Sequence, residues 1–328
     1  MSVDVLLVSL GSTAGLRAAD GELAGSLSRA GASVAVVAAR PQRDVRTLAL
    51  TDLVWAHAAR VTARSGIEEH RPRAVVYCTV TAALLWPRPG AIRFDAPASG
   101  NRVGRHGVWQ RPVERRRLRE APLLVPQAQG ALDEAPTPRA PAVVVPIPVE
   151  PSGPPAGPRD VAAITYAANP EKKGLDRVLA GWAVAGRAGE ELVVTGPDRV
   201  PRARGVRAAG PLAPEAYRAL LRRARVFVTA PRREDYGLAQ LEALADGCAL
   251  VTTEAPGPYA ALPLARELDA RLVGDDLAGA LRTALDDPAP GYAQRALEAI
   301  APYRRAAVDA TVRDELLPRL LAGAPTRS

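Results

Sequence analysis

Short apolar runs alternate along the chain with longer segments in which apolar residues recur at helical spacing. The runs are rich in β-branched residues, which is typical of buried parallel strands. The predicted strands cover residues 3–9, 33–38, 73–79, 91–95, 123–127, 142–148, 161–166, 191–195, 206–211, 226–229 and 248–252. The predicted helices cover residues 20–29, 52–65, 175–185, 214–223, 238–245, 278–285 and 292–320, with a break in the last one at Pro302.

This alternation of strands and helices predicts an α/β protein, and a chain of 328 residues is long enough for two such domains. Residues 150–159 are dense in Pro and Gly, which is typical of a linker. We therefore expect one Rossmann-like domain over residues 1–149 and a second over residues 160–300. Residues 301–328 are expected to form a C-terminal helix that returns to the first domain.

The composition narrows the class of protein. No segment approaches the roughly 20 consecutive apolar residues of a membrane helix. The N-terminal residues include Asp4 and lack a basic leader, so they predict a strand and not a signal peptide. Cys78 and Cys248 lie in different halves of the chain, as expected of reduced thiols in a cytoplasmic protein. The three histidines show no metal-ligand spacing, and we expect no metal site.

The formal net charge of +8 raises the question of an anionic partner such as nucleic acid or a lipid surface. The arginines are scattered among acidic residues, and no helix-turn-helix, zinc or aromatic-basic RNA-binding pattern is present. We interpret the charge as a modest surface surplus and expect no nucleic-acid partner.

Residues 231–248 carry the most informative pattern in the chain. A buried strand leads into a loop with Glu234 and Gly237, a helix follows with Glu242 in its middle, and a second strand comes next. The start of such a helix exposes free N–H groups and the positive end of its dipole, which suit a phosphate. Gly237 would let the backbone approach a ligand closely.

Glu234 and Glu242 would flank this anion cradle, one on each side. Their carboxylates can accept hydrogen bonds from hydroxyl groups, as a sugar and a ribose on either side of a diphosphate would require. Either glutamate alone is more often an ordinary solvated residue. The whole pattern of strand, loop, helix and strand favours the site.

Lys172 and Lys173 are the only lysines in the chain and stand side by side between a predicted strand and a predicted helix. Every other basic position except histidine is arginine, so a compact ammonium group is expected to matter here. Lysine is a natural point-charge partner for phosphate. The alternative is a pair of neutral surface lysines.

Residues 231–248 resemble the signature of retaining GT-B glycosyltransferases of family 4. That signature usually reads Pro-Ser-x-x-Glu-Gly-Phe-Gly-Leu, with a second glutamate eight positions after the first. Here Arg232 stands in place of Ser, Asp235 in place of Gly and Tyr236 in place of Phe. The family's second domain also opens with Gly-Arg and then Lys-Gly. Lys173-Gly174 matches the latter, but Ala167-Ala168 stands in place of Gly-Arg.

The resemblance implies a GT-B fold, with two Rossmann-like domains facing each other across a cleft. It implies a donor that is a UDP-, GDP- or ADP-sugar, transfer of a hexose with retention of configuration, and no cofactor or metal. Glu234 would bind the sugar hydroxyls, Glu242 the ribose, and Lys173 the diphosphate. The remaining donor-side residues implied are Lys172, Tyr236, Gly237, Leu238 and Gly196, with Gly11 and Gly15 in a loop that faces the cleft.

The first domain is expected to present the acceptor, a small molecule, a glycan or a lipid-linked sugar. Asp95 ends a predicted strand and is our acceptor-side candidate, as a hydroxyl-binding group or base. The alternative for Asp95 is a turn cap. The basic segment 101–119 either contacts a membrane surface or forms a solvated helix face, and its candidate arginines are Arg115, Arg116, Arg117 and Arg119.

Two other functions fit the same pattern. A sugar-nucleotide epimerase of the GT-B fold would want an acid pair or a histidine that faces the anomeric carbon from the first domain. A catalytically silent protein would keep the fold and bind a nucleotide sugar without turnover, because a fold alone does not establish a function.

Overall fold

The computed structural model describes residues 2–42, 45, 47–102, 104–136, 140–154 and 159–322. It divides into two compact units. Unit 1 comprises residues 1–148 together with residues 305–328, and unit 2 comprises residues 149–304.

Unit 1 is built on a five-stranded parallel sheet with strand order β2-β1-β3-β4-β5. The strands are short and mostly buried on both faces, as expected of a parallel sheet covered by helices. The elements of unit 1 are β1 (Val5–Ser9), α1 (Ala14–Arg29), β2 (Val34–Ala38), α2 (Leu48–His70), β3 (Ala74–Tyr77), α3 (Val80–Ala83), β4 (Ala91–Phe94), α4 (Ala98–Asn101), α5 (Gln110–Glu120), β5 (Leu124–Pro126), α6 (Gln129–Glu134), α13 (Arg305–Thr311) and α14 (Leu317–Ala322).

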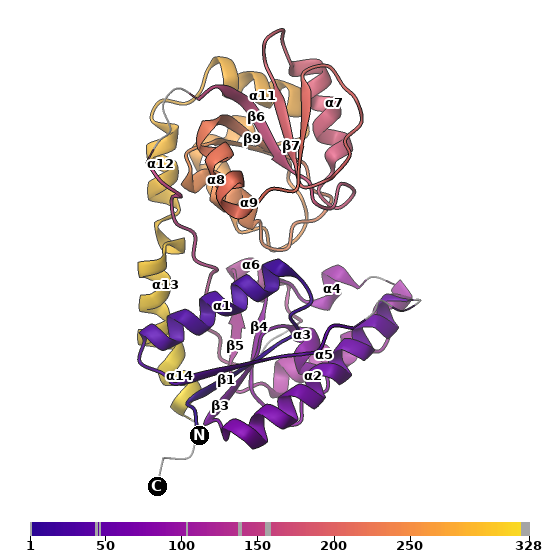
Figure 1. The fold of residues 1–328 in the computed structure, drawn as a ribbon, viewed down its shortest axis with the longest axis vertical. Coiled ribbons are helices and arrows are strands. Elements are labelled where there is room, and N and C mark those ends of the chain that lie inside the picture. Colours follow the sequence, from indigo (N-terminus) through magenta and orange to yellow (C-terminus); the bar gives the residue numbers. More distant parts are fainter. Residues whose placement is uncertain are drawn as a thin grey trace. The chain divides into compact units, whose positions relative to one another are not determined.

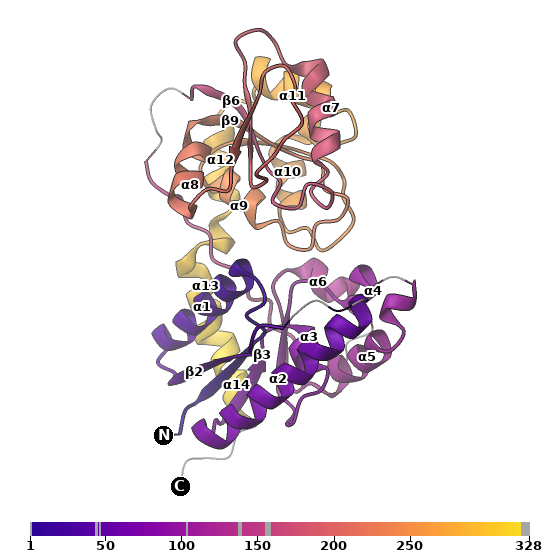
Figure 2. The same cartoon turned by 45° about the vertical axis from the view of Figure 1, so that its right-hand side comes forward.

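Helices cover both faces of this sheet (Figures 1 and 2). One apolar core joins the sheet to α2, α3 and α5, and a second joins it to α1 and the C-terminal helices. The C-terminal segment runs from α13 through a π-helical turn, Val312–Leu316, into α14. Its side chains Val308, Val312, Leu316 and Leu320 are buried against the sheet, so the end of the described chain completes the core of unit 1.

The predicted strand over residues 142–148 is not part of the sheet. The N–H groups of Val143 and Val145 each donate to a carbonyl of β5 at 2.9 Å, so the segment follows that strand only briefly. Pro146 and Pro148 have no N–H group, which prevents the ladder from continuing.

Unit 2 carries a second five-stranded parallel sheet, with strand order β10-β9-β6-β7-β8. Helices α7 and α11 pack on one side of this sheet, and α8, α9 and α12 lie on the other (Figures 1 and 2). The elements of unit 2 are β6 (Val161–Tyr166), α7 (Leu175–Ala185), β7 (Leu192–Thr195), β8 (Val206–Gly210), α8 (Pro214–Arg223), β9 (Ala224–Thr229), α9 (Leu238–Ala245), β10 (Ala249–Thr252), α10 (Ala261–Asp269), α11 (Leu277–Asp286) and α12 (Tyr292–Ala299).

Two helices differ from the prediction in ways that matter for the site. Helix α1 begins at Ala14, because the Thr13 side chain accepts a hydrogen bond from the N–H of Leu16. Gly15 therefore lies in the first turn of a helix and not in a loop. Helix α10 was not predicted, because Pro263 interrupts its apolar pattern; in the first turn of a helix a proline is tolerated.

Replacing Leu316 with Ala should lower the free energy of unfolding by about 2–5 kcal/mol, because the side chain is fully buried in the core of unit 1. Val184→Ala is the control: Val184 is 79% exposed, and its loss should change stability by no more than about 0.5 kcal/mol. Chemical denaturation measures both. A Leu316 variant as stable as the wild type would show that the C-terminal segment does not contribute to the core.

Candidate functional site

The strand order of unit 2 brings three loops together at the carboxyl edge of its sheet. Strand β6 lies between β9 and β7, so the loops that follow these three strands are neighbours. Ligands of parallel α/β sheets bind at this edge. The loop after β6 carries Lys172 and Lys173, the loop after β9 carries Glu234, and Gly196 follows β7.

A backbone contact joins the first two loops. Gly174 has a φ of +62°, and a Cβ atom there would lie 1.9 Å from the carbonyl oxygen of Ala230. No side chain fits at that distance, so only glycine lets the lysine loop rest against the end of β9. A hydrogen bond of 3.0 Å from the N–H of Arg232 to the carbonyl of Lys172 adds to the contact.

Lys173 and Glu234 form the centre of the site. The Nζ atom of Lys173 donates to Oε2 of Glu234 at 2.7 Å, and the amide of Gln240 donates to the same oxygen at 2.9 Å. Glu234 is only 4% exposed. The structure thus brings together the two residues that the sequence proposed for sugar and diphosphate binding.

Lys172 is held by Asp235, a residue that the sequence analysis did not select. The Nζ atom of Lys172 donates to Oδ2 of Asp235 at 2.7 Å, and Nε of Arg233 donates to Oδ1 at 2.9 Å. Burial alone would raise the pKa of the Asp235 carboxyl, but the two cations outweigh it and hold the pKa below its usual value. Asp235 stands where the family signature has a glycine, so the residue that departs from the signature is the one that pairs with Lys172.

Two helices begin beside these lysines without a side-chain cap. Gly237 is the N-cap of α9 with a φ of +90°, and Gly174 is the N-cap of α7. A Cβ atom at Gly237 would lie 2.9 Å from the ring of Tyr259, so glycine is required there too. Neither helix N-terminus receives a hydrogen bond from its cap side chain. In α7 the N–H of Leu175 donates to the carbonyl of Pro170 at 2.9 Å, whereas the first turn of α9 keeps N–H groups available to an anion.

The other donor-side candidates lie around this cluster. Tyr236 is buried and its carbonyl accepts a hydrogen bond from Ala260, and Leu238 is the first residue of α9. Gly196 has a φ of +105°, and a Cβ atom there would lie 2.5 Å from the backbone nitrogen of Ala168. The position where the family carries Gly-Arg is therefore part of the same edge.

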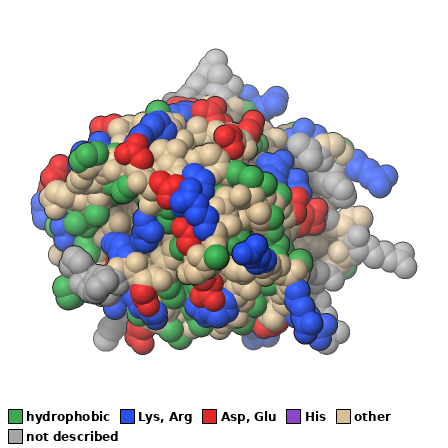
Figure 3. Space-filling view, turned by 90° about the horizontal axis from the view of Figure 1, so that it is seen from above, with side chains coloured by type: hydrophobic (Ala, Val, Ile, Leu, Met, Phe, Trp, Pro, Cys, Tyr) green, Lys and Arg blue, Asp and Glu red, His purple; other side chains and the backbone are tan. Residues whose placement is uncertain are grey.

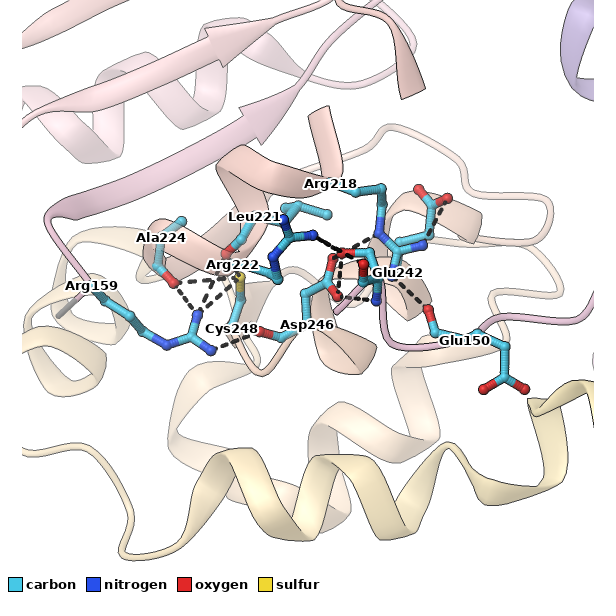
Figure 4. A network of polar contacts seen from close by, with 10 residues as sticks. Glu150, Arg159, Arg218, Leu221, Arg222, Ala224, Glu242, Asp246 and Cys248 are labelled. Atoms are coloured by element: carbon cyan, nitrogen blue, oxygen red, sulfur yellow. Dashed lines mark hydrogen bonds and ion pairs between the residues drawn. The ribbon is translucent and has the colours of Figure 1, made fainter. Parts of the chain in front are cut away.

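Glu242 faces helix α8 (Figure 4). Its Oε1 atom lies 3.6 Å from a guanidinium nitrogen of Arg218. Burial raises the pKa of Glu242, and the charge of Arg218 opposes this shift. Among the described residues Glu234 and Glu242 share no hydrogen-bond or ion-pair partner, so the two glutamates belong to separate clusters.

Asp246, at the end of α9, anchors the cluster around Glu242 (Figure 4). Its carboxylate accepts from Nε of Arg218 at 2.7 Å and from the N–H and hydroxyl groups of Ser152 at 2.8–3.0 Å. Arg218 also donates to the carbonyl of Glu150 at 2.7 Å. Arg218 and Asp246 were not predicted from the sequence. The one available signal was the four-residue spacing of Glu242 and Asp246 on a helix.

In unit 1, Asp95 follows β4 and lines a cavity of about 590 Å³. The cavity opens where the loops after β1 and β3 also meet, with Ser12 and Thr79 in its wall. The Asp95 carboxylate accepts from the N–H of Ala96 at 2.8 Å, as the turn-cap alternative requires. Gly11 has a φ of +62° and belongs to the same edge.

Three further polar residues of this cavity were not predicted. Arg102 donates to both carboxylate oxygens of Asp52, at 2.6 and 3.0 Å. Both carboxylate oxygens of Glu114 accept from the N–H of Ala98, at 2.9 and 2.8 Å. Burial raises the pKa of Glu114 to about 7, against the opposing effects of this hydrogen bond and of Arg102.

The basic segment forms helix α5, and two of its four candidate arginines are paired within the helix. Glu120 accepts from Arg116 at 2.6 Å and from Arg117 at 2.9 Å. Arg117 also lies over the ring of Trp86, 4.9 Å from its centroid. Membrane contact through Arg115, Arg116, Arg117 and Arg119 stays a prediction.

Figure 3 shows a different face, the end of the molecule that is uppermost in Figure 1, where basic and acidic side chains are interspersed.

No helix among the described residues combines the length and the apolar composition of a membrane span. No group of three or more His, Cys, Asp or Glu side chains is placed to hold a metal ion in that part of the chain.

Residues 160–287 match the model of the family Glycosyl transferases group 1. The segment that matches carries a glycosyltransferase domain, and the two-sheet architecture is the GT-B fold. The prediction of a GT-B fold and the resemblance of the second domain to glycosyltransferases are thereby confirmed, and the match covers the edge of the sheet that carries Lys173 and Glu234. No curated protein matches this sequence.

Solved structures resemble the chain over almost its whole length. Sucrose-phosphate synthase from Thermosynechococcus elongatus is 14% identical with a TM-score of 0.77, and the match covers 99% of this chain and 100% of that one. WaaG, a glycosyltransferase involved in lipopolysaccharide biosynthesis, is 13% identical with a TM-score of 0.69 and coverage of 97% and 100%. Alr3699/HepE from Anabaena, in complex with UDP and glucose, is 13% identical with a TM-score of 0.68 and coverage of 96% and 99%. At identities this low, the structural likeness establishes the fold alone.

Replacing Arg218 with Gln should lower the stability of the protein by about 3 kcal/mol or more, because it removes a cation from the buried carboxylate of Asp246. Arg223→Gln on the same helix is the control: Arg223 pairs with Asp160 where both side chains are about half exposed, and its loss should cost no more than about 1 kcal/mol. Denaturation curves measure both. Equal costs for the two variants would contradict the anchoring role of Asp246.

The raised pKa of Glu114 predicts a pH-dependent cost in stability. A carboxyl whose pKa is higher in the folded than in the unfolded state favours folding while it is protonated, and this contribution is lost as the pH rises. The stability of the wild type relative to Glu114→Gln should therefore fall between about pH 4.5 and 7 and level off above that range. Denaturation of both proteins across this range is the measurement, and a difference that does not vary with pH would count against the buried carboxyl.

Proposed function

We propose that this glycosyltransferase moves a hexose from a nucleotide diphospho-sugar to an acceptor hydroxyl, with retention of configuration and without a metal ion. One observation carries the proposal. The ammonium groups of Lys172 and Lys173 meet two uncapped helix N-termini, those of α7 and α9, at one edge of the second sheet. Cations and free N–H groups in this arrangement suit a diphosphate.

The same groups would stabilise the transition state. Negative charge develops on the departing diphosphate, and preorganised donors that face it lower the barrier. The Lys173 side chain is 19% exposed, so water screens its charge less than that of a surface lysine. Lysine and helix dipoles thus supply the cationic role that a metal ion plays in other transferases.

The carboxylates would orient the donor on either side of this centre. Glu234 accepts hydrogen bonds from hydroxyl groups of the transferred sugar, and Glu242 accepts them from the ribose. The acceptor oxygen forms a bond to the anomeric carbon on the face from which the diphosphate departs. The bond from that carbon to the diphosphate oxygen breaks, and the diphosphate takes the acceptor proton.

Lys172 is proposed to replace the arginine that the family signature would place at Ala168. Lys172 is half exposed and is oriented by Asp235, itself a departure from the signature. The arginine that is absent at Ala168 is compensated if the Lys172 ammonium turns from the Asp235 carboxylate to a phosphate oxygen. UDP-sugars are the first donors to test, because the structural neighbour HepE is complexed with UDP and glucose.

A second candidate is a catalytically silent protein that binds a nucleotide sugar. The observation in its favour is the absence of an arginine at Ala167-Ala168, where the family has its Gly-Arg. This candidate predicts nucleotide binding with no transfer and no hydrolysis, so the experiment below separates it from the enzyme.

A panel of UDP, GDP, ADP and their sugars should raise the melting temperature for one base, since a ligand at 100 times its Kd stabilises by about 2.7 kcal/mol. Lys173→Met should reduce this shift, because a diphosphate contact is lost. Glu234→Gln should keep the shift and lower donor turnover about 100-fold, because the sugar loses a charged acceptor. Nucleotide release, with identification of the sugar product, measures turnover.

Glu171→Gln is the matched control, because Glu171 lies exposed on the same loop as Lys173. It should behave as the wild type in both assays. A wild type that no nucleotide stabilises would refute the proposal, and a nucleotide-stabilised wild type without turnover would favour the silent protein. A released nucleotide sugar with inverted stereochemistry would identify an epimerase.

A further inference from the structure

The cavity of unit 1 is rich in hydrogen-bond acceptors. Its wall contains the carboxyl groups of Asp52, Asp95 and Glu114. It also contains Gln110, a residue that is only 3% exposed and whose Oε1 atom has no hydrogen-bond partner among the described residues. A buried oxygen without a partner costs free energy, so the site favours a ligand group that donates a hydrogen bond.

The helix N-termini around this cavity are already capped by the chain itself. Thr13 accepts from Leu16 at the start of α1, at 3.2 Å, and Thr79 accepts from Ala82 at the start of α3, at 3.1 Å. At the first residue of α4, Glu114 places both carboxylate oxygens against the Ala98 N–H. Oxygen atoms of the chain itself thus already accept from these N–H groups.

The charged side chains of the cavity also disfavour an anionic ligand. Arg102 is the one cation among the described residues that line it, and both oxygens of Asp52 bind its guanidinium group. Asp95 is a further carboxyl in the wall, and Glu114 adds negative charge as the pH rises above its raised pKa of about 7. A phosphate or carboxylate in this cavity would meet like charge with no unmatched cation to offset it.

Unit 2 shows the opposite arrangement. Its helices α7 and α9 begin at Gly174 and Gly237 with no side-chain cap, and two lysines stand beside them. The molecule therefore leaves helix termini open to an anion in one unit and closes them in the other. The open termini of unit 2 suit a diphosphate, and the closed termini of unit 1 suit a ligand group that is not an anion.

We propose that the cavity of unit 1 selects an acceptor that donates hydrogen bonds and carries no anionic group: a neutral sugar or polyol, or an amino sugar. This inference rests on the proposed function, because it takes the cavity to be the acceptor site of the transfer. It excludes sugar phosphates as preferred acceptors, although one structural neighbour is a sucrose-phosphate synthase.

The test compares acceptors that differ only in a phosphate group. Glucose, mannose and N-acetylglucosamine are each paired with their 6-phosphates, glucosamine is added, and the donor is the nucleotide sugar with the largest melting shift. Acceptor-dependent nucleotide release is measured above the rate of donor hydrolysis. A parent or amino sugar should have a kcat/KM at least tenfold higher than that of its phosphate. A phosphate used as well as or better than its parent sugar would overturn the inference.

Gln110→Met tests the unpartnered oxygen. It should raise the acceptor KM about fivefold to tenfold, because one hydrogen bond is lost, and leave the melting temperature unchanged or higher. Gln129→Met is the control, since Gln129 is exposed on α6 and does not line the cavity. An unchanged acceptor KM in Gln110→Met would overturn the role of this oxygen. Donor hydrolysis without the expected acceptor preference refutes only this inference, whereas absence of nucleotide binding refutes the proposed function.

Discussion

The close contact between Gly174 and the Ala230 carbonyl is the constraint on which the donor-side site depends. An ion pair alone would not fix the lysines, because the Lys172 side chain is about half exposed in its pair with Asp235 and such a pair is readily rearranged. The backbone contact allows no side chain at position 174 and sets the loop that follows β6 against the end of β9. The lysines then reach Glu234 and Asp235, and the ion pairs refine a position that the backbone has already determined.

Helix α9 is held at both of its ends, and each end has a different chemistry. At its start, glycine replaces a capping side chain, and cations gather beside the free N–H groups. At its end, the buried Asp246 binds Arg218 and the residues that lead into unit 2. A buried carboxylate is costly unless it is paired, so Asp246 stabilises the unit only while Arg218 and Ser152 remain in place. The same arginine is the cation nearest to Glu242, which couples this candidate ribose ligand to the anchor.

The sequence was sufficient to predict local features and insufficient to predict distant pairs. The strands of both sheets, the unit over residues 231–248 and the importance of the lysines follow from short patterns, and the structure confirms the strands except residues 142–148. The pairs Arg218–Asp246 and Arg102–Asp52 join residues 28 and 50 positions apart, which no periodicity reveals. Gly15 was misplaced because a threonine cap starts α1 earlier than its apolar pattern does. The missing information is tertiary for the two ion pairs and a local helix cap for Gly15.

Lysine and arginine differ in the geometry of their hydrogen bonds, and this difference explains why both lysines lie at one site. Arginines such as Arg102, Arg159 and Arg218 bind carboxylates and backbone carbonyls in fixed, often bidentate geometry, and they serve to hold loops together. An ammonium group has three donors on a flexible stem and no planar requirement, so it can exchange one oxygen partner for another at little cost. In the proposed function, Lys173 pairs with the buried Glu234 while no ligand is bound and turns to a phosphate when the donor binds. A guanidinium at position 173 would be bound too rigidly to Glu234 to make that exchange.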